Sequence, residues 1–298
     1  MQTALIGLGK MGYPLALNIA RQHEVIAFDL NEELRKNITA EGINIADSLT
    51  ALINKLSGRK IIWLMVPAGK VVDGIITELI PLLSANDIVI DGGNSFFKDS
   101  VRRSEKLSQY NIHYLDCGTS GGVSGARNGI CAMIGGNKEA FQYCEPVFKS
   151  IALPKGYLYC GKSGSGHFTK MVHNGIEYGM MQSIAEGFAM MHASEYDFNL
   201  KEIAELWNQG SVIRSWLIEL TANAFAKDAM LDKIKGIAHS SGEAQWMVDT
   251  AKAMNIEVPV IDMSLQLRYA SLQKETYAAK VVAALRNEFG GHAVEKNI

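Results

Sequence analysis

Residues 3–12 read Thr-Ala-Leu-Ile-Gly-Leu-Gly-Lys-Met-Gly, and this stretch decides the fold of the first half of the chain. A short predicted strand leads directly into Gly7, Gly9 and Gly12, and a helical pattern follows from Pro14 to Gln22. Glycines at this spacing between a strand and a helix are typical of a dinucleotide-binding turn. Gly7 permits the tight turn, Gly9 lets the backbone approach a pyrophosphate, and Gly12 lets helix and strand pack closely.

An acidic residue closes the next predicted strand. Glu24–Asp29 returns as a strand, and Asp29 lies 17 residues after Gly12. A carboxylate at that place accepts hydrogen bonds from the adenosine ribose hydroxyls and repels a 2′-phosphate. The sequence therefore favours NAD as the cofactor. NADP stays possible but disfavoured, because Arg35 lies one turn further on and could relax the preference.

Strands and helices continue to alternate after this unit. Lys60–Val66 and Asp87–Ile90 are apolar strands, and each ends in a short polar or glycine-containing loop. In such sheets ligands bind beyond the carboxyl ends of the strands. We therefore predict an α/β Rossmann-like dinucleotide-binding domain over residues 1–165. Besides the glycines and Asp29, the residues expected to contact the cofactor there are Lys10, Met11, Val66, Pro67, Ala68 and Asn94.

A glycine-rich segment, 118–125, lies between two further apolar runs, Ile112–Leu115 and Ile130–Ile134. We predict it to be a loop. Its exposed N–H groups and the Ser120 hydroxyl could hold a carboxylate or a phosphate. A flexible surface loop without a ligand is the competing interpretation.

The second half of the chain changes character. Strand alternation fades after the glycine- and serine-rich segment 161–166, which predicts a domain boundary. We expect an all-α domain over residues 166–298. Its predicted helices cover 166–194, 200–208, 213–227, 242–254 and 259–287.

The first of these helices carries a polar stripe. Positions three and four residues apart share a helical face, and here they are Lys170, His173, Asn174, Glu177 and Tyr178. A lysine and a carboxylate two turns apart can reach opposite ends of one small substrate, which suits a base and an acid. The helix directly follows the predicted boundary, so we expect the stripe to line a cleft between domains. An ordinary solvated helix face is the alternative.

Composition excludes several functional classes. The 298 residues are 48% hydrophobic and carry a formal net charge of -2, so no strong field attracts nucleic acid or anionic membrane. The longest apolar stretch, Ile61–Ala68, is far shorter than the roughly 20 residues that span a bilayer. The four cysteines have no metal-binding spacing, and no cationic segment precedes the first apolar run. A cytoplasmic protein without a metal is expected.

Taken together, the motifs resemble the 6-phosphogluconate dehydrogenase family of the decarboxylating type. The resemblance covers essentially the whole chain, and its length and Asp29 are similar to the shorter, NAD-using branch. The motifs that carry it are Gly7-Leu-Gly-Lys-Met-Gly12, Met65-Val-Pro-Ala-Gly69, Asp91-Gly-Gly-Asn-Ser95, Ser120-Gly-Gly122 and Gly166-His-Phe-Thr-Lys-Met-Val-His-Asn-Gly-Ile-Glu-Tyr178.

The resemblance implies a reaction of the pentose phosphate pathway. Lys170 would take the proton of the substrate 3-hydroxyl while hydride leaves C3 for the nicotinamide. Carbon dioxide would then leave, and the protonated lysine would stabilise the enolate without a metal. Glu177 would protonate C1 to give D-ribulose 5-phosphate.

The resemblance also implies the substrate contacts. Ser120, Gly121, Gly122, His173 and Asn174 would hold the carboxylate and hydroxyls of a phosphorylated sugar acid, and Tyr178 and Arg268 the phosphate. The segment from Arg286 to His292 resembles a family tail that reaches a neighbouring subunit's site, which implies a homodimer or homotetramer. Read without the family, this segment is a frayed end. Gln245 stands where the family usually has a cation, which puts phosphate affinity in doubt.

Two other functions remain open. One is a non-decarboxylating β-hydroxyacid dehydrogenase acting on an unphosphorylated acid, but such relatives have no equivalent of Glu177. The other is a catalytically silent NAD-binding assembly protein, which predicts decay of the polar stripe. The complete stripe and the presence of Arg268, Arg286 and His292 favour the phosphorylated substrate.

Overall fold

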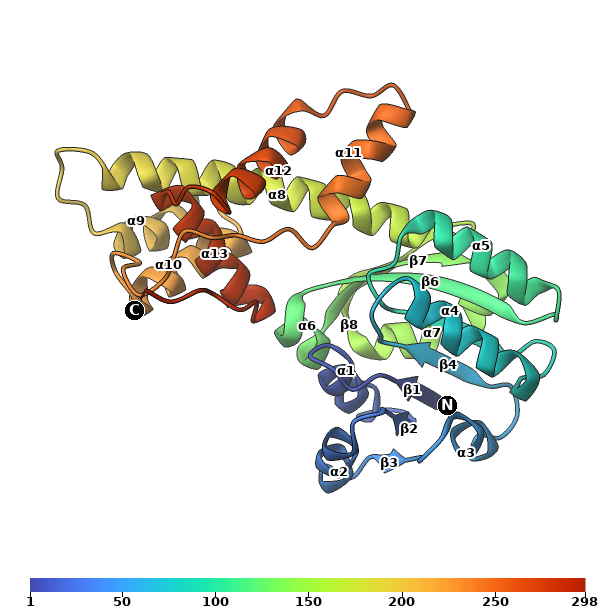
Figure 1. Cartoon of the computed structure of the whole chain (residues 1–298). Coiled ribbons are helices and arrows are strands. Elements are labelled where there is room, and N and C mark those ends of the chain that lie inside the picture. The colour runs from blue at the N-terminus through green and yellow to red at the C-terminus, as the bar shows by residue number, and fades with distance from the viewer. Residues whose placement is uncertain (298) are drawn as a thin grey trace. The chain divides into compact units, whose positions relative to one another are not determined.

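The computed structural model describes residues 1–297, which form two compact units that divide after Lys170. The division falls inside one long helix, α8 (Ser165–His192), which begins where the sequence predicts the start of the helical region. Figure 1 follows the chain through both units.

The first unit is built on one sheet of eight strands in the order β3-β2-β1-β4-β5-β6-β7-β8. The strands from β3 to β6 in this order run parallel to their neighbours, β7 pairs antiparallel with β6, and β8 pairs parallel with β7. The order reverses at β1, which confirms the Rossmann-like prediction. The strands are β1 (Gln2–Ile6), β2 (Glu24–Phe28), β3 (Asn44–Ile45), β4 (Ile61–Leu64), β5 (Ile88–Asp91), β6 (His113–Ser120), β7 (Ile130–Gly136) and β8 (Ala152–Gly161).

Helices cover both faces of this sheet because successive strand residues point to opposite sides. Leu5 packs in a core with Leu15 and Phe148, whereas its neighbour Ile6 packs in a second core with Val72. The helices of this unit are α1 (Gly12–Ile19), α2 (Glu32–Ala40), α3 (Leu49–Asn54), α4 (Lys70–Leu79), α5 (Phe97–Ser108), α6 (Gly122–Asn128) and α7 (Lys138–Ile151), with a 3₁₀ turn at Ile80–Leu82.

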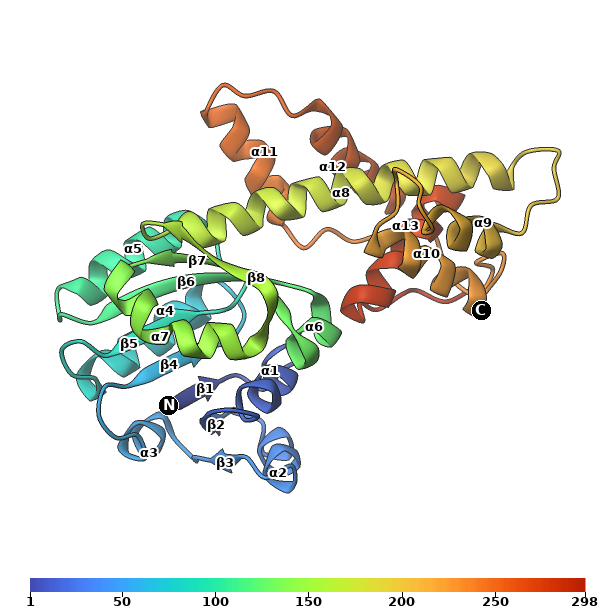
Figure 2. The same ribbon diagram turned by 180° about the vertical axis from the view of Figure 1, so that it is seen from behind.

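The second unit is helical, as predicted. Figure 2 shows α9, α10 and α13 gathered around the C-terminal part of α8. Met181, Ala185 and Phe188 recur on one face of α8 and pack in a core with Phe225 and Leu285. After α8 come α9 (Leu200–Trp207), α10 (Trp216–Lys227), α11 (Glu243–Ala253), α12 (Pro259–Ser271) and α13 (Tyr277–Gly290).

Two predicted elements were wrong. The expected single helix over 259–287 is two helices, because the chain leaves the helix after Ser271 and Thr276 starts a new one by accepting a hydrogen bond from the Ala279 N–H (3.1 Å). The expected loop over 118–125 is regular structure. Strand β6 continues to Ser120, and α6 begins at Gly122 after a left-handed turn at Gly121 (φ 115°).

Strand β8 was not predicted. Its burial is only partial, so it lacks the apolar alternation by which a strand is recognised. Within residues 1–297, no helix combines the length and apolarity that crossing a membrane requires.

Candidate active site

The glycine turn after β1 has the geometry that its spacing predicts. Gly7 has φ +99°, and a Cβ there would lie 2.4 Å from the Met65 carbonyl oxygen. A Cβ on Gly12 would lie 1.9 Å from the Gly7 carbonyl oxygen. A Cβ on the exposed Gly9 would meet nothing within 4 Å. Packing inside the protein thus requires Gly7 and Gly12, whereas the open space at Gly9 is suited to a closely approaching ligand.

Asp29 lies at the end of β2 and supports the same turn. One carboxylate oxygen accepts a hydrogen bond from the Leu8 N–H (2.6 Å), and the other accepts one from the Asn31 N–H (2.7 Å). The guanidinium of Arg35 donates to the carbonyl oxygens of Asp29 (2.5 Å) and Leu30 (3.3 Å). Arg35 is therefore held by the backbone of the β2–α2 turn.

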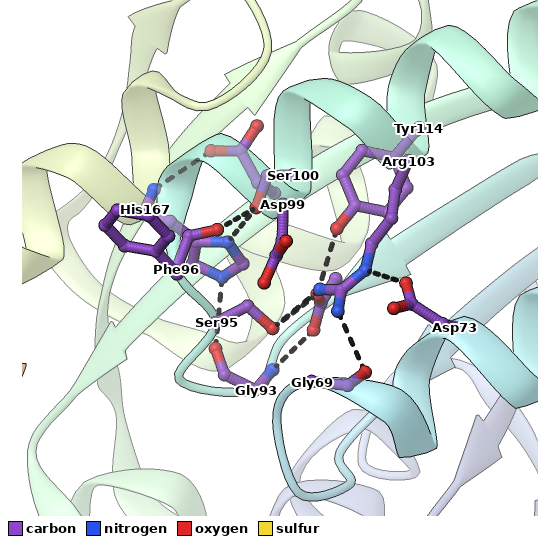
Figure 3. Close-up of polar contacts among 12 residues, drawn as sticks. Gly69, Asp73, Gly93, Ser95, Phe96, Asp99, Ser100, Arg103, Tyr114 and His167 are labelled. Carbon is purple, nitrogen blue, oxygen red and sulfur yellow. Dashed lines mark hydrogen bonds and ion pairs between the residues drawn. The ribbon is translucent and has the colours of Figure 1, made fainter. Parts of the chain in front are cut away.

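The loops that follow β4 and β5 are joined by a buried arginine that the sequence did not single out. Arg103 of α5 donates to the Gly69 carbonyl (3.0 Å) after β4 and to the Ser95 hydroxyl (3.1 Å) after β5. It also forms ion pairs with Asp73 (2.8 Å) and Asp91 (3.1 Å) (Figure 3). Burial alone lowers the pKa of Arg103, but the Asp73 hydrogen bond and neighbouring negative charges raise it overall.

Around this network lie the other predicted cofactor residues. Pro67, Ala68 and Asn94 are exposed at the carboxyl ends of β4 and β5, and Val66 is half-buried. Lys10 is exposed and Met11 half-buried in the turn after β1. The structure thus brings the predicted residues to the edge of the sheet where its strand order reverses.

The start of α8 is packed tightly against the sheet. The buried Asp116 of β6 accepts hydrogen bonds from the backbone N–H groups of Gly164 (2.7 Å) and His167 (2.9 Å). A Cβ on Gly118 would lie 2.4 Å from the Cβ of Lys170, so the lysine stem lies directly on β6. Lys170 is buried, with 9% of its surface exposed. This turn of helix therefore fixes the base of the Lys170 side chain against β6.

Ser120, Gly121 and Gly122 lie two to four residues beyond Gly118, at the junction of β6 and α6. All three are half-buried. Because a strand advances about 3.3 Å per residue, this junction is within reach of a substrate that also contacts Lys170.

The remaining members of the polar stripe are not a solvated face. Asn174 and Tyr178 are buried, whereas His173 and Glu177 are half-buried. The His173 Nδ1 lies 3.1 Å from the Asn174 side-chain oxygen and 3.9 Å from a Glu177 carboxylate oxygen. Three different polar groups thus meet on neighbouring turns of α8, which an ordinary surface helix would expose to water.

Two buried arginines lie near Tyr178. The guanidinium of Arg268 stacks on the Tyr178 ring, with 3.6 Å from its central carbon to the ring centroid. Arg268 and Arg286 are only 3% and 7% exposed. Burial lowers the pKa of Arg268 to about 10, although the Tyr178 hydroxyl opposes this, and the charge of Arg286 lowers it further. Burial also lowers the pKa of Arg286.

Within residues 1–297 neither arginine forms an ion pair, and the Arg268 Nη1 has no hydrogen-bond partner. The charges of Glu177 and Glu243 raise the pKa of both arginines, against the effect of burial. Gln245, which stands where a cation was expected, donates to Asp249 (2.9 Å) and accepts from the Tyr269 hydroxyl (3.2 Å).

The predicted C-terminal tail begins inside a helix. Arg286 belongs to α13, which ends at Gly290, and the Asn287 side chain donates to the His292 carbonyl (2.8 Å). Lys296 then forms a bridge with Ile234 of the same unit. The reach of this segment into a neighbouring subunit stays a prediction.

Comparison with known proteins decides the family. Residues 2–161 match the model described as the NAD binding domain of 6-phosphogluconate dehydrogenase. Residues 166–297 match the model of the 6-phosphogluconate dehydrogenase C-terminal domain. The chain belongs to the 6-phosphogluconate dehydrogenase family. It is therefore an oxidoreductase of this type with an NAD-binding domain, as the sequence motifs predict.

Individual relatives agree. A Bacillus subtilis (strain 168) protein provisionally named 6-phosphogluconate dehydrogenase YqeC is 52% identical, covering 99% of this chain and 100% of the relative. The NAD(+)-dependent, decarboxylating 6-phosphogluconate dehydrogenase of Haloferax volcanii is 42% identical, covering 99% of each chain. The solved 6-phosphogluconate dehydrogenase of Plasmodium falciparum, studied with NADP+ and with 6-phosphogluconate, has a TM-score of 0.86 at 33% identity. That match covers 92% of this chain and 62% of the Plasmodium chain.

Proposed function

We propose that the protein oxidises and decarboxylates 6-phospho-D-gluconate to D-ribulose 5-phosphate and carbon dioxide, with NAD as the hydride acceptor. The observation that carries this proposal is the pair of buried guanidinium groups of Arg268 and Arg286 without an ion-pair partner.

A buried charge is costly unless it is paired. A phosphate dianion supplies two charges and several acceptor oxygens, and guanidinium groups bind such oxygens well. An unphosphorylated β-hydroxyacid whose carboxylate is held at Ser120–Gly122 would have no second anion to pair with the arginines. The arginine pair therefore favours the phosphorylated substrate over the alternative dehydrogenase.

The proposed chemistry uses the two ends of the polar stripe. Lys170 accepts the proton of the 3-hydroxyl and, once protonated, stabilises the negative oxygen that develops as carbon dioxide leaves. Glu177 lies seven residues further along α8, about 10 Å along the helix axis. It donates a proton to the enediol that remains after carbon dioxide leaves, at the carbon that becomes C1 of ribulose 5-phosphate. The cofactor, when bound at the glycine turn and Asp29, would supply the acceptor for the hydride that leaves C3.

The preference for NAD rests on Asp29. Its carboxylate is held by the N–H groups of Leu8 and Asn31, at the place where adenosine ribose hydroxyls bind in this fold. Arg35, the nearest cation along the chain, is engaged with backbone carbonyls rather than turned toward a 2′-phosphate. The Haloferax relative is NAD(+)-dependent, which agrees with this proposal.

The test supplies the purified protein with 6-phosphogluconate and records reduced cofactor and carbon dioxide, with NAD and NADP in parallel. One carbon dioxide per NADH, and a clear preference for NAD, are expected. Turnover of gluconate or small β-hydroxyacids in place of 6-phosphogluconate would overturn the proposal.

Glu177→Gln tests the protonation step that follows the loss of carbon dioxide. Because the amide cannot protonate C1, we expect ribulose 5-phosphate formation to fall by about 100-fold or more, within the usual range for loss of a general acid. The NAD dissociation constant, measured by fluorescence titration, should stay unchanged. Turnover equal to that of the wild type would remove Glu177 from the mechanism.

A further inference from the structure

His167 lies in the first turn of α8, three residues before Lys170, and is only 1% exposed. Its imidazole bridges two other parts of the first unit (Figure 3). The Nδ1 atom lies 2.7 Å from the Ser100 hydroxyl of α5, and the Nε2 atom lies 3.0 Å from the Gly93 carbonyl oxygen.

Hydrogen-bond chemistry fixes the direction of the Gly93 contact. A carbonyl oxygen only accepts, so Nε2 carries a proton and donates it to Gly93. The Ser100 hydroxyl can then donate to Nδ1. The backbone N–H of His167 donates separately to Asp116 of β6. One residue thus joins the start of α8 to β6, to α5 and to the loop that follows β5.

The Gly93 carbonyl group, which accepts the His167 hydrogen bond, lies next to an expected cofactor contact. It belongs to the peptide bond with Asn94, which is exposed at the carboxyl end of β5 among the residues expected to contact the cofactor. Holding this carbonyl therefore restricts the orientation of the Asn94 backbone. Lys170 lies on the same side of α8 as His167, since residues three apart share a helical face.

We propose that His167 is a positioning residue, which couples the Gly93–Asn94 segment to the turn of α8 that carries Lys170. This inference rests on the proposed function. In that reaction the hydride acceptor and the base act on the same C3–OH group at the same time. A displacement of about 1 Å between these two reacting groups can reduce the rate of such a step by about 100-fold. The Nε2–H to Gly93 bond holds the two parts in one geometry.

A matched pair of variants isolates this bond. His167→Gln keeps a terminal N–H donor near the Nε2 position, whereas His167→Met has a similar length and shape without a donor. Both change the Ser100 contact in the same way. Ser100→Ala is the complementary control, because it leaves the Nε2 contact with Gly93 in place.

The measurements are kcat, KM, Tm and the primary deuterium isotope effect with 6-phosphogluconate labelled at C3. We expect His167→Met to lower kcat by about 100-fold and to raise the isotope effect on kcat, because hydride transfer becomes rate-limiting. His167→Gln should recover most of the rate, and Ser100→Ala should stay within about tenfold of the wild type.

Equal kcat and isotope effects in His167→Gln and His167→Met would overturn the proposal, as would a lower Tm with unchanged turnover per folded molecule. If His167→Met does not fold, His167→Asn replaces it, because its shorter amide cannot reach Gly93, and the same comparison applies. Wild-type protein that does not turn over 6-phosphogluconate would overturn the proposed function. A wild type that turns it over, with indistinguishable variants, would overturn only the role of His167.

Discussion

Each unit of the molecule contains a buried arginine, but the two arginines differ in whether an acidic side chain neutralises their charge. Arg103 in the first unit is 1% exposed and bonds to the oxygens of Asp73, Asp91, Ser95 and Gly69. Arg268 in the second unit is 3% exposed, lies on an aromatic ring and forms no ion pair within residues 1–297. The pKa of Arg103 is raised, whereas burial lowers the pKa of Arg268 to about 10.

Arg103 thus supports the fold, whereas Arg268 is the arginine that, under the proposed function, binds the substrate phosphate. A buried cation whose nitrogens are all hydrogen-bonded adds rigidity to the loops that it joins. A buried cation without a counter-charge lowers stability in the free protein. Perturbed groups of the second kind are typical of functional sites. Substitution of Arg103 should therefore lower unfolding stability, whereas substitution of Arg268 should lower substrate affinity without loss of stability.

The largest expected effect is on folding. Arg103→Met should lower the free energy of unfolding by about 3–5 kcal/mol, because it leaves the Asp91 carboxylate buried without its cation. Urea denaturation measures this change. Arg102→Met is the matched control. Its side chain is 52% exposed and pairs with the same Asp73, so about 1 kcal/mol or less is expected. Equal losses would contradict the structural role of Arg103.

The next effect is on substrate binding. Arg268→Met should raise KM for 6-phosphogluconate by about 100-fold, or about 2.8 kcal/mol, while unfolding stability stays the same or increases, since an unpaired buried charge is removed. Steady-state kinetics and urea denaturation test both parts on one preparation. A loss of stability similar to that of Arg103→Met would show that Arg268 supports the fold instead.

Inorganic phosphate gives a second test of Arg268 without turnover. At ten times its dissociation constant, phosphate should stabilise the wild type by about 1.4 kcal/mol. Sodium chloride at the same ionic strength serves as the control. Phosphate should not stabilise Arg268→Met in this way. Equal stabilisation of the variant and the wild type would show that phosphate binds at a different site.

The smallest effect concerns pH. Burial alone raises the pKa of Asp73, but hydrogen bonds from Arg103 and Arg102 lower it below its ordinary value of 3.8. The resulting stabilisation is fully present above the unfolded-state pKa and is lost as pH falls through the lower folded-state value. Unfolding stability measured from pH 7 to pH 3 should therefore fall more steeply in the wild type than in Asp73→Asn. Parallel curves of stability against pH for the two proteins would show that Asp73 does not contribute to the acid sensitivity.

The sequence predicted the features that local patterns determine. The turn from Gly7 to Gly12 was predicted because its glycines have fixed spacing between a strand and a helix. The polar face of α8 was predicted because helical periodicity alone places Lys170 and Glu177 on one side. The break at 272–276 was missed, although Thr276 is a good N-cap, because the apolar periodicity resumes after it.

Long-range polar contacts could not be predicted in this way. His167 contacts Gly93, 74 positions earlier, and Arg103 contacts Asp73, 30 positions earlier. No periodicity relates such positions, and an arginine in a helix is more often exposed than buried. The signal that could have suggested them is their place in the sequence: His167 belongs to the motif Gly166–Tyr178, and Arg103 follows the motif Asp91–Ser95.

The contact between Gly118 and Lys170 has a genetic consequence. Every coding change at position 118 introduces a Cβ, and that atom would lie 2.4 Å from the Cβ of the lysine. No conservative replacement exists, since even alanine brings the clash. We therefore expect any substitution of Gly118 to displace Lys170, to lower activity and to be removed by natural selection. Position 118 would tolerate as little drift as the lysine itself, although glycine takes no part in the chemistry.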